Sequence, residues 1–307
     1  MEGSTTYAAD PADWRASPTS SMTIDSHQHF WHYNPQRDTW ITEEMGVLKR
    51  NFLPGDLLPE LKANGVDGCV AVQADQSEEE TLFLLRLAES HPEIQGVVGW
   101  VDLRASNVGE RLDYFSQFPK LSGIRHVVQA ESDDRFMLRE EFQRGIAELE
   151  AFGFSYDILI YPRQLPAAIE LTATFPRQRF VLDHIAKPPI GAGELEPWAD
   201  LIAELATHSN VYCKLSGMVT EADWRHWKVE HFRPYLDVVF NAFGPKRLMF
   251  GSDWPVCLLG GTYRDVKNLL ISYTNLLPRE QQERIFGLNA IEFYRLNARR
   301  HGPGATR

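Results

Sequence analysis

Short apolar runs and amphipathic stretches alternate along most of this chain. Eight of the apolar runs are bounded by Gly, Pro, Asp or Ser, which is typical of parallel strands buried on both faces. These predicted strands are residues 23–30, 68–74, 96–102, 121–128, 155–161, 179–186, 211–217 and 247–254. The stretches between them repeat their apolar positions with the period of a helix, as in residues 53–65, 77–92 and 139–153.

Eight strands, seven intervening helices and a helical C-terminal region predict a (β/α)8 TIM barrel. We expect residues 23–297 to form this catalytic barrel, between a flexible tail at residues 1–22 and a second tail at residues 298–307. An open, doubly wound sheet is the structural alternative, but no Gly-x-Gly-x-x-Gly follows the first predicted strand.

One predicted helix shows its orientation clearly. In residues 77–92, the apolar face is expected to contain Leu82, Leu85, Leu87 and Ala88, with charged residues opposite. We expect this face to pack on the strands.

Composition narrows the class of partner. The chain has 307 residues and a formal net charge of −11, which disfavours nucleic acid or an anionic membrane surface as its partner. No apolar run approaches the length of a membrane span. The three cysteines are far apart, which indicates buried thiols in a reducing compartment, and we expect the protein to be cytoplasmic.

Polar side chains gather where several predicted strands end. His27 and His29 are two residues apart, so on a regular strand they point the same way, and Asp25 is expected on that face too. His184 lies near the end of the sixth strand and Asp253 near the end of the eighth. Catalytic groups of barrels converge at the C-terminal ends of the strands, so these residues predict an active site. The alternative is a hydrogen-bonded pair of structural histidines.

Other residues near the strand ends are candidates for substrate contact. They are Gln73, Arg125, His126, Lys214, Trp31 and Trp254. Arg and Lys suit carboxylate or hydroxyl groups, and Trp suits the C–H surface of a sugar ring. Pairing with structural carboxylates is the alternative for Lys214 and Arg125, and packing is the alternative for Trp254.

The remaining histidines are expected to lie outside the site. His32 is offset from the His27/His29 face, which indicates a loop residue. Five others are expected at the surface, namely His91, His208, His226, His231 and His301. The loop over residues 31–53 is long enough to be functional.

The motifs "IDSHQHFW", "GVDGCVAVQA", "GIRHVVQ", "VLDHIAKP", "YCKLSG" and "LMFGSDWPV", in this order, resemble the amidohydrolase superfamily. More narrowly, they resemble its sugar-lactone hydrolase branch, which includes L-fuconolactonases and L-rhamnonolactonases. The resemblance covers residues 23 to about 297 and implies a (β/α)8 barrel. It also implies that His27, His29, His184 and Asp253 are the catalytic and metal-binding positions.

The chain departs from the binuclear members of that superfamily. A bridging Lys on the fourth strand is absent, since Arg125 and His126 stand there, and Tyr161 rather than a histidine ends the fifth strand. The resemblance therefore implies at most one divalent ion, such as zinc. Some relatives in this branch work without metal.

The resemblance implies hydrolysis of a small-molecule sugar acid lactone, of the L-fuconolactone or L-rhamnonolactone type. Asp253 is the candidate general base for the attacking water. With zinc bound, the metal would polarise the carbonyl; without it, His27, His29 and His184 would donate hydrogen bonds to the developing oxyanion. Three alternatives stay open: a dicarboxylate lactone hydrolase of aromatic degradation, a metal-dependent decarboxylase, and a barrel that only binds a ligand.

Overall fold

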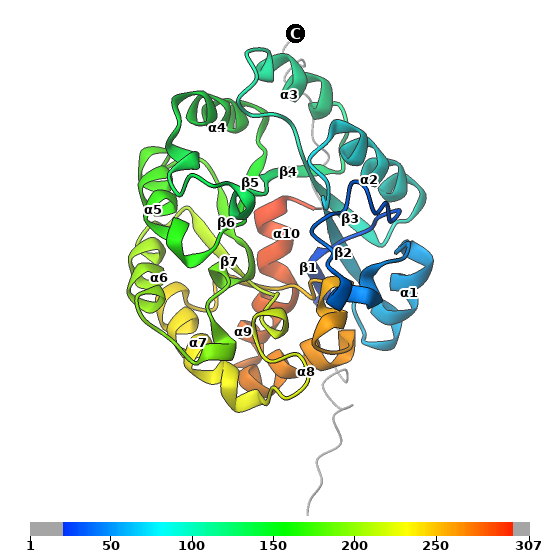
Figure 1. Ribbon diagram of the computed structural model, residues 1–307, viewed down its shortest axis with the longest axis vertical. Coiled ribbons are helices and arrows are strands. Elements are labelled where there is room, and N and C mark those ends of the chain that lie inside the picture. The colour runs from blue at the N-terminus through cyan, green and yellow to red at the C-terminus, as the bar shows by residue number, and fades with distance from the viewer. Residues whose placement is uncertain (1–20, 297–307) are drawn as a thin grey trace, which may run out of the picture.

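Eight parallel strands form a nearly closed barrel in the computed structural model, which describes residues 21–296 (Figure 1). The strands pair in sequence order. They are β1 (Ile24–Gln28), β2 (Gly68–Val72), β3 (Ile94–Gly99), β4 (Leu121–His126), β5 (Ser155–Ile158), β6 (Phe180–Leu182), β7 (Val211–Leu215) and β8 (Leu248–Phe250). All eight predicted strands are confirmed, although each is shorter than its apolar run.

The barrel closes through the segment that follows β8. The backbone N–H of Asp253 donates to the carbonyl of His27 at 2.8 Å, and the N–H of His29 donates to the carbonyl of Trp254 at 2.7 Å. These two bonds join the first strand to the last, so the open doubly wound alternative is wrong. They also fix the backbone of the predicted site residues in β1 and after β8.

Seven α-helices connect successive strands and surround the barrel (Figure 1). They are α1 (Pro54–Ala63), α2 (Glu78–Ser90), α3 (Val108–Ser116), α4 (Glu140–Phe152), α5 (Leu165–Thr174), α6 (Trp198–Ala206) and α7 (Val229–Phe243). Three more follow β8, namely α8 (Tyr263–Thr274), α9 (Arg279–Glu283) and α10 (Asn289–Tyr294). This order confirms the (β/α)8 TIM barrel.

The buried face of α2 differs slightly from the predicted one. Leu85 and Ala88 are buried as expected, whereas Leu82 and Leu87 are only partly buried. Leu84 and Thr81 face the core instead. The Thr81 hydroxyl donates to the Trp100 carbonyl at 2.9 Å and accepts from the Trp100 N–H at 2.8 Å. A polar residue that bonds to backbone is invisible to an apolar pattern.

The apolar interior has two parts. The larger cluster lies between the strands and the surrounding helices. The smaller one lies inside the barrel, where Phe293 and Tyr294 of α10 pack against strand residues such as Val70, Val98 and Met249. Figure 1 shows α10 in the middle of the ring of strands. One end of the barrel interior is therefore filled by apolar residues, and the polar site occupies the other.

The first loop is folded rather than irregular. Trp31 and Phe52 exchange two backbone hydrogen bonds of 3.0 and 2.9 Å, which close the loop over residues 31–53. A short 3-10 helix, η2 (Glu43–Leu48), lies within it.

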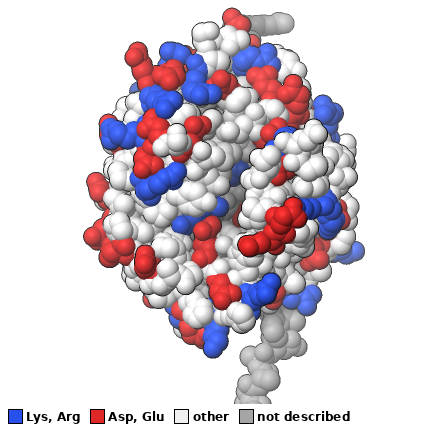
Figure 2. Space-filling model, in the orientation of Figure 1, with Lys and Arg blue, Asp and Glu red and all other residues white. Residues whose placement is uncertain are grey.

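Charges of both signs are spread over the surface. Figure 2 shows acidic and basic side chains intermixed on the face that it presents, which is hollowed near its middle. A nucleic-acid or anionic-membrane partner would instead call for a broad basic patch, and this face displays none.

All three cysteines are buried free thiols, as expected. Across residues 21–296, none of the helices has the length and apolarity that crossing a bilayer demands. His32, His226 and His231 are exposed, whereas His91 and His208 are half-buried. His301 and most of the two predicted tails lie outside the described residues.

Candidate active site

One site histidine, His27, lies in strand β1 and another, His29, directly follows it, and the strand deviates from regular alternation. Ile24 packs inside the barrel, and the pairing of β1 with β2 is irregular between Asp25 and Gln28. This irregularity turns Asp25 outward, where it accepts hydrogen bonds from Ser252 and from Tyr263 of α8. The expectation that Asp25 shares a face with the histidines is wrong, because an extra residue in a strand changes the alternation.

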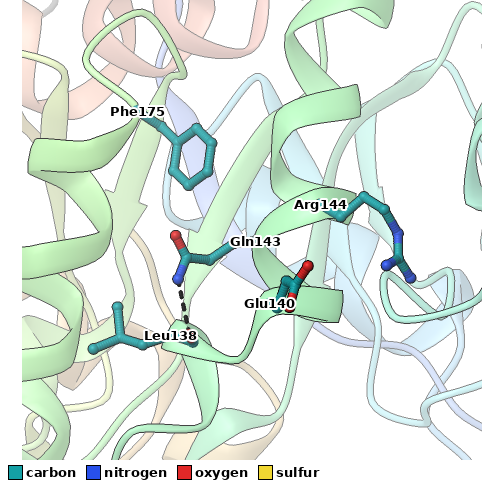
Figure 3. Close-up of a pocket in the computed structure, with 5 residues that line it drawn as sticks. All are labelled: Leu138, Glu140, Gln143, Arg144 and Phe175. Carbon is teal, nitrogen blue, oxygen red and sulfur yellow. Dashed lines mark hydrogen bonds between the residues drawn. The ribbon is translucent and has the colours of Figure 1, made fainter.

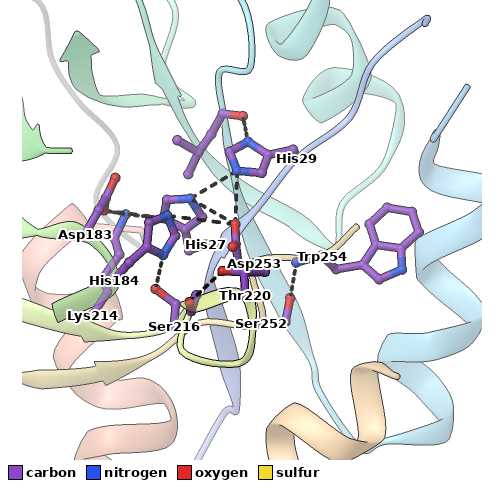
Figure 4. A network of polar contacts seen from close by, with 12 residues as sticks. His27, His29, Asp183, His184, Lys214, Ser216, Thr220, Ser252, Asp253 and Trp254 are labelled. Atoms are coloured by element: carbon purple, nitrogen blue, oxygen red, sulfur yellow. Dashed lines mark hydrogen bonds and ion pairs between the residues drawn. The ribbon is translucent and has the colours of Figure 1, made fainter. Parts of the chain in front are cut away.

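The four predicted catalytic residues converge as Figure 4 shows. Nε2 of His27 lies 3.1 Å from Nε2 of His29. One oxygen of Asp253, Oδ1, lies 3.4 Å from His29 Nε2, 3.8 Å from His27 Nε2 and 3.9 Å from His184 Nε2. All four side chains are almost completely buried. Residues from the first strand and from the segment after the last strand thus meet around one carboxylate oxygen.

The orientation of His29 is fixed by the backbone. Its Nδ1 lies 2.8 Å from the carbonyl of Val72, and a carbonyl only accepts, so Nδ1 carries the proton. In the neutral form of the ring, the lone pair of Nε2 then faces Asp253 Oδ1, which is also an acceptor. Two acceptors 3.4 Å apart repel one another unless a proton or a cation lies between them. This arrangement fits a metal ligand set.

His184 begins a turn of unusual backbone geometry. Strand β6 ends at Leu182, and four consecutive residues then have positive φ angles: His184 (54°), Ile185 (49°), Ala186 (60°) and Lys187 (50°). Residues with a Cβ avoid this left-handed region. Such strain persists only where the surrounding structure imposes it, and it clusters at functional sites.

Gly217 makes room for the His184 ring. A Cβ at Gly217 would lie 2.5 Å from His184 Nδ1, and the φ of Gly217 is +62°. The imidazole is further held by a 2.9 Å contact between Nδ1 and the Ser216 hydroxyl. The residues after β7 therefore determine where the His184 ring lies.

Replacing Gly217 with alanine should displace His184 and lower the kcat/KM of the reaction at this site about 100-fold. A displacement of a catalytic group by about 1 Å costs about this much. Gly193→Ala is the matched control, since Gly193 has φ +69° but nothing within 4 Å of an added Cβ. Both variants should lose about 1–2 kcal/mol of stability from the left-handed backbone. Equal activity of the two, measured beside thermal unfolding, would contradict this role for Gly217.

A charge network lies directly beneath His27. The ammonium Nζ of Lys214 lies 2.6 Å from Asp157 Oδ2, 2.9 Å from Asp183 Oδ1 and 3.1 Å from His27 Nδ1. Arg125 binds the other oxygen of Asp183 at 3.0 Å. Two cations and two carboxylates thus balance in the barrel interior, where burial of an unpaired charge is costly.

Both carboxylates of this network are absent from the residues expected at the site from the sequence. Asp183 directly precedes His184 in "VLDHIAKP", and Asp157 lies within the fifth strand. The signal available was a buried-strand pattern interrupted by an acidic residue, which demands a cationic partner.

The same network limits the number of cations. Within residues 21–296, two groups of side chains have the spacing of a metal site: His27 with His29 and Asp253, and His27 with Asp183 and His184. In the second group, the ammonium of Lys214 already contacts both His27 Nδ1 and Asp183 Oδ1. A second metal ion there would meet this positive charge. The described residues therefore fit one metal ion, on the side of Asp253.

Burial sets the protonation states of the site. It lowers the pKa of His27 well below its usual value and that of His184 to about 4. Both imidazoles are therefore neutral near pH 7 and offer lone pairs. Burial alone would raise the pKa of Asp253, but the neighbouring histidines, His184 foremost, outweigh it and hold that pKa below its usual range. The carboxylate is therefore ionised.

The six candidate substrate residues are all buried. Arg125 donates to the side-chain oxygen of Gln73 at 3.1 Å, and Gln73 donates back to the Arg125 carbonyl at 3.3 Å. His126 lies 2.8 Å from Glu131 and stacks on Phe136. These contacts link β2 and β4 to each other and to the loop after β4.

The two tryptophans pack within the protein. Trp31 donates to the Arg50 carbonyl at 2.9 Å. Trp254 contacts Phe52 edge to face, and Figure 4 shows its indole pointing away from the histidines. Trp31 is thus packed within the first loop, and Trp254 is packed against the end of that loop.

A surface hollow of about 430 Å³ lies elsewhere, between α4 and α5 (Figure 3). It is lined by Leu138, Glu140, Gln143, Arg144 and Phe175. It contains none of the residues of the histidine cluster, so it does not belong to the candidate active site.

Known proteins resemble this chain along nearly its whole length. L-fucono-1,5-lactonase from Burkholderia multivorans is 42% identical over 287 residues, which cover 90% of this chain and 97% of that protein. L-fucono-1,5-lactonase from Burkholderia ambifaria is 37% identical, with the same coverage of both chains. A crystal structure of a Burkholderia multivorans amidohydrolase with bound zinc has a TM-score of 0.87 at 41% identity, covering 90% of this chain and 99% of that one.

The family follows from the barrel, the histidine cluster and these likenesses together. The amidohydrolase family model matches residues 24–296, which is the whole barrel including α10. This chain belongs to the amidohydrolase family.

Proposed function

We propose that this protein hydrolyses the internal ester of a sugar acid lactone, of the L-fucono-1,5-lactone type. The observation that carries the proposal is the ionised carboxylate of Asp253 among three histidines. The L-fucono-1,5-lactonases at 37% and 42% identity support the choice of lactone. The buried free thiols are consistent with a reducing, cytoplasmic setting.

Asp253 acts as general base in the proposed reaction. Its Oδ1 accepts a proton from the water that attacks the lactone carbonyl, and its low pKa keeps it ionised beforehand. The ester C–O bond then breaks as the ring opens, and the proton is delivered to the leaving ring oxygen. His184, 3.9 Å from Asp253, is the nearby group through which that proton can return.

We further propose one zinc ion held by His27, His29 and Asp253, with His184 beside them. When bound, the ion would lower the pKa of water and polarise the carbonyl. The chain's part is to orient the imidazoles: the Val72 carbonyl fixes the proton of His29 on Nδ1, burial keeps His27 neutral, and Asp183 Oδ1, 3.3 Å from His27 Nδ1, can hold the proton of that ring away from the metal side. Hydrogen bonds from the histidines to the oxyanion are the alternative without metal.

Arg125 and Lys214 act in this proposal from beneath the site rather than on the substrate. Their charges are already balanced by Asp183 and Asp157. These two cations are therefore not available to the carboxylates of a dicarboxylate lactone or of an aromatic acid.

A screen by acid release tests the function. L-fucono-1,5-lactone and other aldonolactones should be hydrolysed, whereas a dicarboxylate lactone and dihydroxybenzoates should not react. Decarboxylation of an aromatic acid, or turnover of the dicarboxylate lactone alone, would replace the proposal with one of its alternatives. Binding of a ligand without turnover of any compound would support the ligand-binding barrel.

Metal analysis should find one zinc ion per chain in purified protein. Chelator should remove the ion and the activity together, and added zinc should restore both. His29→Ala should abolish metal binding, whereas His226→Ala, at an exposed position, should not. Metal-free protein whose activity resists chelator would instead assign the histidines to hydrogen bonding.

A further inference from the structure

The strained turn after β6 connects the catalytic cluster to a second charged group. Lys187 is its last residue, and the Lys187 N–H donates to the His184 carbonyl at 2.8 Å. The turn therefore fixes the backbone of Lys187 relative to that of His184.

Lys187 faces an acidic residue in the loop that follows the next strand, β7. Its ammonium lies 3.4 Å from Oε1 of Glu221, which ends the 3-10 helix η8 (Val219–Glu221) after β7. The side chains are 15% and 21% exposed, so solvent reaches both. The ammonium also lies 5.7 Å from the centre of the Tyr161 ring, which is 38% exposed at the end of the fifth strand run.

This group lies beside the segments that hold His184. Lys187 belongs to the same left-handed turn as His184. Glu221 directly follows Thr220, whose hydroxyl donates to the Gly217 carbonyl at 2.7 Å, and Gly217 packs against the His184 ring. Helix η8 is held there by close packing, because a Cβ on Gly260 would lie 2.7 Å from the Val219 carbonyl.

The pair offers both kinds of hydrogen-bonding group. An ammonium has three donors and a carboxylate has several acceptor sites. Among the described residues, Glu221 is the one polar partner found for the Lys187 ammonium. The other N–H donors of Lys187 and the other acceptor sites of Glu221 therefore remain for a ligand. Neighbouring hydroxyls on a ring both donate and accept, and the exposed face of Tyr161 suits the C–H surface of such a ring.

We propose that Lys187 and Glu221 are specificity-determining residues that bind ring hydroxyls of a polyhydroxylated lactone, with Tyr161 as the apolar wall. The inference rests on the proposed function and adds the part of the site that distinguishes a sugar lactone from an unsubstituted lactone. Neither residue takes part in bond breaking.

Two lactones with the same ring test the proposal. L-fucono-1,5-lactone carries hydroxyls, and δ-valerolactone has the same six-membered ring without them. For Lys187→Met and Glu221→Gln, kcat/KM for the sugar lactone should fall about 10- to 100-fold, the usual loss of a hydrogen bond to a charged group. The value for δ-valerolactone should change less than about threefold. Arg279→Met, which breaks an exposed pair with Glu283 on α9, should change neither.

Binding without turnover supplies a second measurement. In an Asp253→Asn background, calorimetry should show that Lys187→Met and Glu221→Gln each weaken the sugar lactone about 10-fold or more. Equal losses for both lactones, or an unchanged dissociation constant, would overturn the proposal. Failure of the wild-type protein to hydrolyse any lactone would instead refute the proposed function, and the binding measurement would still report on the hydroxyl contacts.

Discussion

Asp253→Asn should lower kcat/KM for the sugar lactone by about 10²- to 10⁴-fold, which is the usual contribution of a general base. The substitution keeps the shape of the side chain but removes its ability to take a proton at neutral pH. The backbone should tolerate it, because Asp253 has a φ of 57° and asparagine enters this left-handed region readily. Steady-state kinetics and thermal unfolding measure the two effects separately.

Stability of the Asp253→Asn protein should be lower than that of the wild type near pH 7. The neighbouring histidines hold the pKa of Asp253 below its usual range, so the folded protein favours the carboxylate over a neutral side chain, and the substitution removes that contribution. Asp200→Asn, at an exposed position on α6, is the control and should leave activity unchanged. Near-normal turnover in Asp253→Asn would remove this residue from the role of base.

Lys214→Met should destabilise the protein by about 3–5 kcal/mol, the usual cost of removing one partner from a buried ion pair. Lys214 is fully buried, and its loss would leave Asp157 and Asp183 with one cation, Arg125, between them. Urea unfolding measures the free-energy change. A loss below about 1 kcal/mol would show that the network does not need this cation.

A double variant separates charge balance from packing. Asp157→Asn in the Lys214→Met background removes the excess negative charge, while the new amide oxygen can still accept from the Tyr294 hydroxyl, which lies 2.6 Å from Asp157 in the wild type. We expect it to recover a large part of the lost stability. If the double variant were no more stable than Lys214→Met, the loss would come from packing of the lysine stem rather than from charge.

The same network shows where a pattern of residue types stops being informative. Lys214 and Arg125 have the chemistry of substrate-binding residues, and so the sequence admits that interpretation beside a structural one. Lys214 of β7 binds Asp157 of β5, and Arg125 of β4 binds Asp183, directly after β6; each pair thus reaches past an intervening strand. Which carboxylate reaches which cation depends on strand register, and a single sequence does not contain it.

Asp25 shows a related limit. Alternation along a strand predicts its direction only while the strand stays regular. The irregular pairing of β1 with β2 turns Asp25 toward Tyr263 while His27 and His29 remain at the site. Such an irregularity depends on contacts with the neighbouring strands, which the sequence of β1 alone does not describe.

The sequence by itself determined the strand order and the barrel, and it singled out four polar residues that the structure brings together. Buried parallel strands must be apolar, so polar side chains that interrupt them stand out in the sequence. Tertiary structure alone decided how those side chains meet: His29 fixed by the Val72 carbonyl, Lys214 in the place of a second cation, and Lys187 aligned with Glu221 by a left-handed turn. Each of these depends on distances between residues far apart in the chain, and only closure of the barrel sets those distances.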